Sequence, residues 1–303
     1  MAEEFLYPTE MIKTFWFSTL RDIGYATDLS VHNPLPVTGV DSQPMTLSLR
    51  IFEPRTSSVP ESIPIGTLGP ECRMNIDIES ILNDLSVVGD VVGVLHMTPS
   101  EFVNSDKTSI AIGTLQKWTS ISDEFVGYRH LVSGIKSGVH YQSGHMNDCR
   151  ISTSRTIIMQ SPKIVISDRV DTKLLLFTPS SDYDNHDSVS IHIAILHASG
   201  EVAARTSVTL GMRQRTLISV KKILSEANQL ETYISNGGYG MMVGLAQDGN
   251  VVPLSLAADS IGGLAIDHTL PPPYYIPWWG GNPRKRATQD LINKFFSDQV
   301  SSQ

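Results

Sequence analysis

The stretch TLGPECRMNIDIESIL, residues 67–82, decides the fold, because the chain contains a second copy of it. Residues 209–224 read TLGMRQRTLISVKKIL, and seven of the sixteen aligned positions are identical at a constant offset of 142. The same offset aligns TLSLRI, residues 46–51, with SVSIHI, residues 188–193. Two ungapped matches at one offset predict an internal duplication, with two halves related by pseudo-twofold symmetry.

Each copy has the pattern of short strands. In the first copy, apolar and polar residues alternate over 46–51 and again over 74–78, as in half-buried strands. Apolar residues then recur at helical spacing over 78–85, and an apolar run follows at 91–97, with 241–247 as its counterpart. Many strands with one short helix per copy predict an all-β fold. We expect a tandem duplicated β-sandwich of the immunoglobulin or fibronectin type, followed by a C-terminal helix.

These signals divide the chain into five parts. We expect an N-terminal segment (1–25), a first sandwich repeat (26–137), a linker with a crossover strand (138–162), a second sandwich repeat (163–272), and an aromatic and basic tail that ends in a helix (273–303). In the N-terminal segment, Thr9 as a helix cap and the spacing of Met11 and Phe15 favour a helix, although the run Phe15–Phe17 also suits a strand.

The composition is typical of a globular protein with few charges. Hydrophobic residues make up 41% and charged residues 18% of the chain, and the net charge of −8 argues against a nucleic-acid partner. No apolar stretch reaches the roughly 18 residues of a transmembrane helix, and the acidic N-terminus lacks a secretory-signal pattern. We therefore expect a soluble protein that is cytoplasmic as written, with a removed signal as the open alternative. Cys72 and Cys149 are too few for a disulfide framework.

Histidines are the residues with the clearest potential for chemistry. His130, His140 and His145 lie within sixteen residues, and His130 aligns with His268 because each copy closes on a strand that ends in histidine. Imidazole is a common ligand of transition metals, so His130, His140, His145 and His268 are candidate metal ligands. His130, His268 and Asp267 are candidate catalytic residues. Ordinary hydrogen-bonded or exposed histidines are the alternative.

The tail begins with an aromatic block, TLPPPYYIPWWGG, residues 269–281. Tyr274, Tyr275, Trp278 and Trp279 are candidate ligand-binding residues, because such a block can line a pocket for a small apolar molecule, with Asp267 and His268 as its polar groups. Alternatively, the block covers a sheet edge or forms a protein interface. Farther along, an apolar helical face should dock on a sandwich; its members are Leu291, Phe295 and Phe296.

Two hypotheses of function follow. The first is a non-catalytic binding or assembly protein that self-associates or binds a protein partner. It is favoured by the duplication, by the tail, and by the lack of nucleotide-binding, zinc-protease and nucleophile-elbow motifs. The second is a metal- or histidine-dependent enzyme that acts on a small apolar molecule at the interface between the repeats, since domain interfaces are preferred places for sites.

Overall fold

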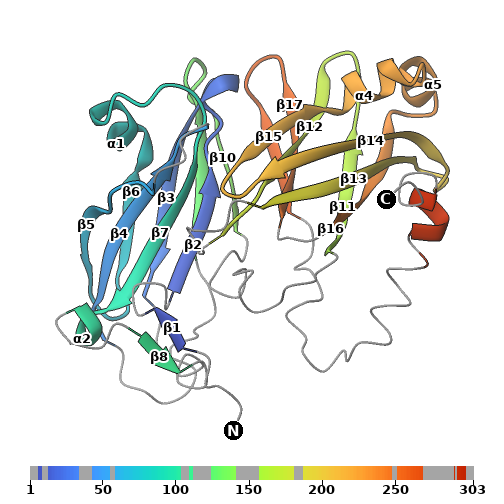
Figure 1. The fold of residues 1–303 in the computed structure, drawn as a ribbon. Coiled ribbons are helices and arrows are strands. Elements are labelled where there is room, and N and C mark those ends of the chain that lie inside the picture. Colours follow the sequence, from blue (N-terminus) through green and yellow to red (C-terminus); the bar gives the residue numbers. More distant parts are fainter. Residues whose placement is uncertain are drawn as a thin grey trace, which may run out of the picture. The chain divides into compact units, whose positions relative to one another are not determined.

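The chain folds into two compact units, Met1–Asn147 and Asp148–Gln303. The computed structural model describes residues 6–8, 13–33, 43–54, 59–103, 109–111, 124–140, 157–180, 187–247, 251–268, 290 and 292–297. Each unit contains two four-stranded antiparallel sheets (Figure 1), so the predicted all-β sandwich fold is confirmed. Within the described part of the chain, no helix has the length and apolar character needed to cross a membrane.

The first unit is a β-sandwich in which most strands pair with strands that are distant in the sequence. Its elements are β1 (Leu6–Pro8), β2 (Lys13–Ser18), the 3-10 helix η2 (Arg21–Ile23), β3 (Tyr25–His32), β4 (Met45–Phe52), β5 (Ile63–Leu68), β6 (Arg73–Asp77), α1 (Ile78–Asp84), β7 (Val92–Pro99), α2 (Ser100–Val103), β8 (Ser109–Ala111), β9 (Phe125–His130) and β10 (Lys136–His140). One sheet has the order β2-β7-β4-β5 and the other β10-β9-β3-β6, while β1 pairs with β8. The chain therefore crosses repeatedly from one sheet to the other.

The second unit is built in the same way. Its elements are β11 (Ile157–Val165), β12 (Val170–Phe177), β13 (Ser188–His197), β14 (Val202–Gly211), β15 (Arg215–Ser219), α4 (Val220–Glu226), α5 (Leu230–Ser235), β16 (Tyr239–Gln247), β17 (Val252–Asp259), β18 (Leu264–His268) and the π-helix η6 (Ile292–Phe296). Its sheets have the orders β11-β16-β13-β14 and β18-β17-β12-β15.

The two units share one strand order. The sheet β2-β7-β4-β5 corresponds strand by strand to β11-β16-β13-β14, and β10-β9-β3-β6 corresponds to β18-β17-β12-β15. The pairs β3–β6 and β4–β7 correspond to the pairs of strands B–E and C–F in an immunoglobulin domain. The outer strands are exchanged, because β2 lies beside β7, where such a domain has its last strand, and β9 lies beside β3, where it has its first.

Unusual backbone conformations recur at the offset found in the sequence. Glu71 has φ 56° and Arg213 has φ 60°, while Ser86 has φ 58° and Asn228 has φ 54°. Each pair is 142 residues apart, and among the described residues these four are the non-glycine residues with positive φ. Such a conformation is uncommon for any residue other than glycine. Its recurrence therefore indicates that the turns before β6 and after α1 have the same conformation as the equivalent turns in the second unit.

The helix caps repeat as well. Asp77 accepts a hydrogen bond from the backbone N–H of Ser80 at 3.0 Å and begins α1. Ser219, 142 residues later, accepts one from the backbone N–H of Lys222 at 3.1 Å and begins α4. A side-chain oxygen at this position satisfies a backbone donor that has no partner within the helix. The shared order, turns and caps are what a duplication predicts, although the origin of the two halves stays a prediction.

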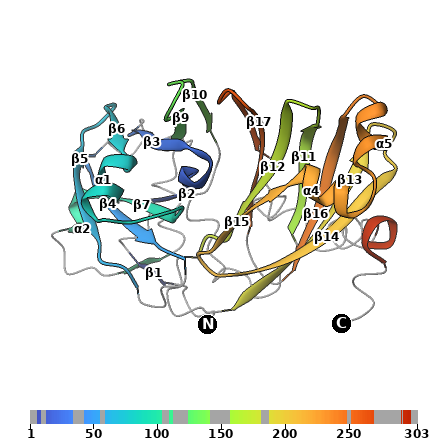
Figure 2. The same cartoon turned by 90° about the horizontal axis from the view of Figure 1, so that it is seen from above.

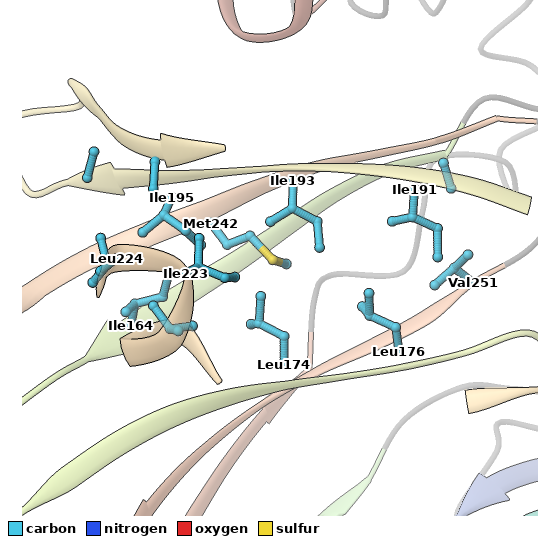
Figure 3. Packing of buried hydrophobic residues seen from close by; sticks show 14 of the residues in the cluster. Ile164, Leu174, Leu176, Ile191, Ile193, Ile195, Ile223, Leu224, Met242 and Val251 are labelled. Atoms are coloured by element: carbon cyan, nitrogen blue, oxygen red, sulfur yellow. The ribbon is translucent and has the colours of Figure 1, made fainter. Parts of the chain in front are cut away.

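The core of the second unit lies between its sheets. Figure 3 shows the inward side chains of β13 opposite those of β12, with residues of α4 at one end. The labelled members from these three elements are fully or almost fully buried: Ile191, Ile193, Ile195, Leu174, Leu176, Ile223 and Leu224. Alternation along each strand places these apolar residues on one face, and burial of that face stabilises the sandwich.

One connection is longer in the second unit. Ile51 pairs with Gly93 in β4–β7, and Ile193 pairs with Gly244 in β13–β16, so the offset rises from 142 to 151. The extra nine residues accommodate α5, which lies beside α4 (Figure 2). The predicted match of 91–97 with 241–247 is therefore wrong by one residue. Such a slip matters, because it would turn every side chain of the strand to the opposite face.

The N-terminal segment contributes a strand to the first sandwich. The expected helix is wrong, because β2 pairs with β7 over its whole length. Phe15 and Phe17 are fully buried, and the intervening Trp16 is also buried, with its ring stacked on Phe52 at 5.7 Å between centroids. Both faces of β2 are thus covered. Three successive aromatic residues therefore suit this strand better than a helix with one apolar stripe.

The C-terminal segment docks on the second unit. Phe295 and Phe296 of η6 are buried on the outer face of the sheet that contains β13 and β16, against Ala194, Leu196, Val243 and Leu245. Arg205 fixes the backbone, since its Nε donates to the carbonyl oxygen of Phe295 at 2.7 Å. The predicted docking of an apolar face is confirmed for Phe295 and Phe296, while Leu291 lies outside the described residues.

Candidate ligand-binding face of the first unit

The outer face of the sheet β10-β9-β3-β6 carries a group of polar side chains. Along β3 and β6, alternation buries Leu29 and Ile76 in the core and leaves Asp28, Ser30 and Asn75 half-buried or exposed on the other face. Strand pairing places these outward residues side by side, with Ser30 opposite Asn75. The paired, regular strands therefore hold the backbone of these polar residues in fixed positions.

An aromatic ring lies low over the same face. Phe125, the first residue of β9, is 41% exposed. A Cβ atom built on Gly138 of β10 would lie 2.1 Å from Cζ of Phe125, so the ring occupies the space that a side chain at Gly138 would fill. Gly127 would bring a Cβ to 3.7 Å from the same ring. Glycine within a strand often marks such a close approach, and here it lets Phe125 lie close to the sheet.

A cavity of about 570 Å³ lies over this ring and its polar neighbours. Its lining includes Phe125 from β9, Asp28 and Ser30 from β3, Asn75 and Asp77 from β6, and Lys136 from β10. Small-molecule sites commonly have this size and combine apolar walls with a few fixed polar groups. All of the named lining residues belong to the first unit.

Two carboxylates face each other in this lining. Asp28 and Asp77 are directly opposite in the β3–β6 register, where like charges destabilise a sheet. Asp77 also caps α1. The side chain of Asp28 makes no hydrogen bond or ion pair within the described part of the chain. Its carboxylate therefore keeps its full capacity to accept hydrogen bonds from a molecule in the cavity.

The centre of the equivalent face in the second unit is apolar, although Lys173 and Ser219 lie where the first unit has Asp28 and Asp77. The strand registers place Leu254 where the first unit has Phe125, Leu256 where it has Gly127, and Ile266 where it has Gly138. Leu254 and Leu256 are fully or almost fully buried. The exposed ring and the two glycines thus belong to the first unit alone among the described residues of this face, whereas polar side chains occur in both units.

His130 has a local role at the end of the β9–β10 hairpin. Its Nδ1 lies 2.8 Å from the hydroxyl oxygen of Ser133 and accepts a hydrogen bond from the Ser133 backbone N–H at 3.2 Å. Its ring also contacts Tyr25, at 5.1 Å between centroids. His130 therefore holds a tight turn. His140 lies at the opposite end of this hairpin, so the two candidate ligands do not converge.

The strand registers correct the predicted alignment of His130 with His268. His268 pairs with Leu254, and His140 pairs with Phe125, so His140 is the structural counterpart of His268. The alignment failed because it matched the end of β9 with the end of β18, whereas β9 corresponds to β17 and β10 to β18. His140 is exposed on the outer face, directly opposite Phe125, and is the candidate residue nearest to the cavity in register.

The other candidate residues do not form a site within the described part of the chain. Asp267 and His268 are neighbours on β18 and point to opposite faces of it. No group of three or more His, Cys, Asp or Glu residues that could hold a metal ion occurs among the described residues. Outside the described residues lie His145, Tyr274, Tyr275, Trp278 and Trp279. The metal and catalytic roles stay predictions.

The sequence contains a pattern that indicates this face and that the histidine and tail predictions did not include. The two strands read FVGYRH and KSGVH, and each has a glycine in its interior. Glycine weakens a strand unless another group needs its space, so two of them on paired strands indicate a close approach. The partner of that approach, Phe125, and the polar row of β3 and β6 become visible only when the pairing of four distant strands is known.

Comparison with known proteins adds little. No protein-family model matches the chain, and no curated protein matches it. A search of solved structures finds a β-glucuronidase from glycoside hydrolase family 2, at 10% identity and a TM-score of 0.19, covering 81% of this chain and 22% of that one. A Bacteroides uniformis β-glucuronidase matches at 8% identity and a TM-score of 0.19, covering 84% and 25%. The chain thus spans about a quarter of the length of these structures.

Proposed function

We propose that this chain is a non-catalytic binding protein and that its first unit binds a small molecule on the outer face of the sheet β10-β9-β3-β6. The observation that carries the proposal is the cavity of about 570 Å³, which combines an exposed aromatic ring with fixed polar groups. Apolar walls supply binding energy and a few polar groups fix orientation, which is how small-molecule sites are composed.

The location on regular strands supports a binding role. Asp28 and Phe125 extend from β3 and β9, which are paired on both sides, and Asn75 extends from the edge strand β6, which pairs with β3, so the backbones of all three are held by hydrogen bonds. A preorganised site loses little entropy when a ligand binds. The contrast with the second unit gives further support, because Leu175, Leu217 and Leu254 occupy the positions equivalent to Ser30, Asn75 and Phe125 there. The fold alone therefore does not require a polar, hollowed face.

We also propose that the two units arose by duplication and then diverged in their outer faces. The common strand order and the turn and cap residues at the offset of 142 support this origin. In this proposal the inner faces kept the sandwich core, while the first unit acquired or retained the binding face. Self-association or a protein partner remains part of the proposed binding role, and the C-terminal segment is its candidate region.

Nuclear magnetic resonance gives a direct test. The backbone amides of Gly127 and Gly138 report on the cavity, and that of Gly244 in β16 serves as a matched control in the second unit. A library of small polar molecules should contain compounds that shift the first two signals, leave the third unchanged, and lose this effect in Phe125→Ala. If no compound in a diverse library shifts Gly127 or Gly138, the proposed binding face is wrong.

A further inference from the structure

We infer that the ligand of this cavity is a saccharide, with one sugar ring stacked on Phe125 and its hydroxyl groups bound by Asp28 and Asn75. The inference rests on the proposed function, because it names the chemical class that the same face would bind. It follows from the way in which one aromatic ring, several hydrogen-bonding groups and charges of both signs are combined in one lining.

The position of Phe125 suits a flat ligand. Because Gly138 leaves space beneath it, the ring lies low over the sheet and is still 41% exposed. A pyranose ring offers a face of C–H groups and carries its hydroxyl groups around the edge. Contact between such a face and an aromatic ring combines apolar burial with weak C–H interactions. A ligand placed on Phe125 would therefore direct its edge toward the surrounding polar side chains.

The polar lining matches a molecule that both donates and accepts hydrogen bonds. The carboxylate of Asp28 only accepts, Lys136 only donates, and the amide of Asn75 does both. A hydroxyl group can satisfy each of them, because it is a donor and an acceptor at once. Hydroxyl donors would also relieve the repulsion between Asp28 and Asp77, which are directly opposite each other.

Other ligand classes fit less of the lining. An organic cation would use Phe125 and the two aspartates, but Lys136 lines the same cavity and would repel it. A phosphate or carboxylate ligand would pair with Lys136 but would meet Asp28 and Asp77. A purely apolar molecule would leave those groups without hydrogen bonds. A neutral polyol is the class that none of these side chains opposes.

The experiment titrates the full chain with probes of each class and follows the amides of Gly127 and Gly138. The neutral probes are cellobiose, maltotriose, xylobiose and N,N′-diacetylchitobiose, and the others are choline, arginine amide and inorganic phosphate. At least one neutral saccharide should shift both signals in a saturable manner. If only choline, arginine amide or phosphate does so, the saccharide inference is overturned while the binding face stands. If no probe does so, the saccharide inference fails, and the diverse library then decides the binding face.

Variants test how the saccharide is held. Phe125→Ala should weaken binding at least about tenfold, and Phe125→Trp should retain or strengthen it, because stacking area is kept. Asp28→Asn has the same shape and should weaken binding about fivefold, because a charge-assisted hydrogen bond becomes a neutral one. Val132→Ala, at a position that is 91% exposed in the β9–β10 turn, is the control and should leave affinity unchanged.

Folding is checked by the unfolding midpoint and by the amide spectrum of each variant. Phe125→Ala removes the side chain that lies over Gly138 and can disturb β10. Asp28→Asn keeps its shape and removes no internal hydrogen bond within the described residues, so it remains informative if Phe125→Ala does not fold. Two outcomes would overturn the inference. The first is saccharide binding that is unchanged both in the single variant Asp28→Asn and in the double variant that combines Asp28→Asn with Phe125→Trp. The second is saccharide binding that is unchanged in a folded Phe125→Ala.

Discussion

Replacing Phe296 by alanine should release the C-terminal segment from the second unit. Phe296 is fully buried on the outer face of the sheet, where it contacts the apolar cluster of β13 and β16. Its ring lies 6.2 Å from that of His192, whose two ring nitrogens are buried and have no hydrogen-bond partner in the described part of the chain. The Phe296 side chain thus shields the apolar cluster of β13 and β16 and the imidazole of His192 from water.

The magnitude follows from area and entropy. An aromatic side chain buries 150–250 Å², which at about 25 cal/mol/Å² gives roughly 4–6 kcal/mol for Phe296 and a similar upper value for Phe295. Ordering the five residues of η6 costs about 1.5 kcal/mol each, or roughly 7 kcal/mol. Docking is therefore favourable by only a few kcal/mol. Loss of Phe296 should abolish it and lower the free energy of unfolding by about 2–4 kcal/mol.

Hydrogen exchange measured by mass spectrometry separates local release from global unfolding. In Phe296→Ala, peptides covering residues 290–297 should exchange at the rate of an unstructured chain, while core peptides of β12 remain protected. Phe296→Leu should show a partial effect, because it keeps much of the apolar side chain. Val88→Ala, at a position that is 88% exposed in the first unit, serves as the neutral control. Unchanged exchange over 290–297 in Phe296→Ala would refute the docking energetics.

Three further perturbations test the packing. Gly240→Ala should destabilise the second unit by about 3 kcal/mol or more, since its Cβ would lie 1.9 Å from the backbone oxygen of Leu196; Gly127→Ala, with no contact nearer than 3.7 Å, should cost far less in urea unfolding. Burial, followed by the charge of Tyr239, raises the pKa of Tyr233 to about 12. Its neutral form is thus favoured in the fold, so about 3 kcal/mol of stability should be present below pH 10 and be lost as the pH rises toward 12, an effect that Tyr233→Phe should remove. Ile76→Ala should cost about 2–4 kcal/mol because Ile76 is buried, whereas Ile218→Ala should cost less because Ile218 is half-buried; equal costs below about 1 kcal/mol would contradict the assigned strand faces.

The sequence predicted the elements whose pattern is local. Alternation over 46–51 and the helical spacing over 78–85 correspond to β4 and α1, and the offset of 142 matched these elements to β13 and α4. It failed where the halves differ in length, since α5 inserts residues before β16 and the β9–β10 hairpin aligns with β17–β18 only across gaps. It also failed at β2, because a strand covered on both faces has no alternation to detect.

The candidate site could not be predicted in the same way, because its parts are distant in sequence. Asp28, Asn75, Phe125 and Gly138 come from four strands, and only the sheet order β10-β9-β3-β6 brings them to one face. Histidine clustering was a weaker guide. It identified His140, which lies opposite Phe125, but also His130, which holds a turn through Ser133. Sequence proximity therefore gave His130 and His140 equal weight as candidates, although only His140 lies on the outer face that carries the cavity.

A comparison of the two units separates the requirements of the fold from those of binding. On the inner face, Leu29 and Leu174 occupy equivalent positions and both are fully buried, as the sandwich core requires. On the outer face, the equivalent of Ser30 is Leu175, which is also fully buried. The same strand order thus tolerates either a polar or an apolar residue on that side. Polar side chains are common on a sheet face that contacts water, so the exposed ring of Phe125 among them is the feature that the proposed ligand binding would explain.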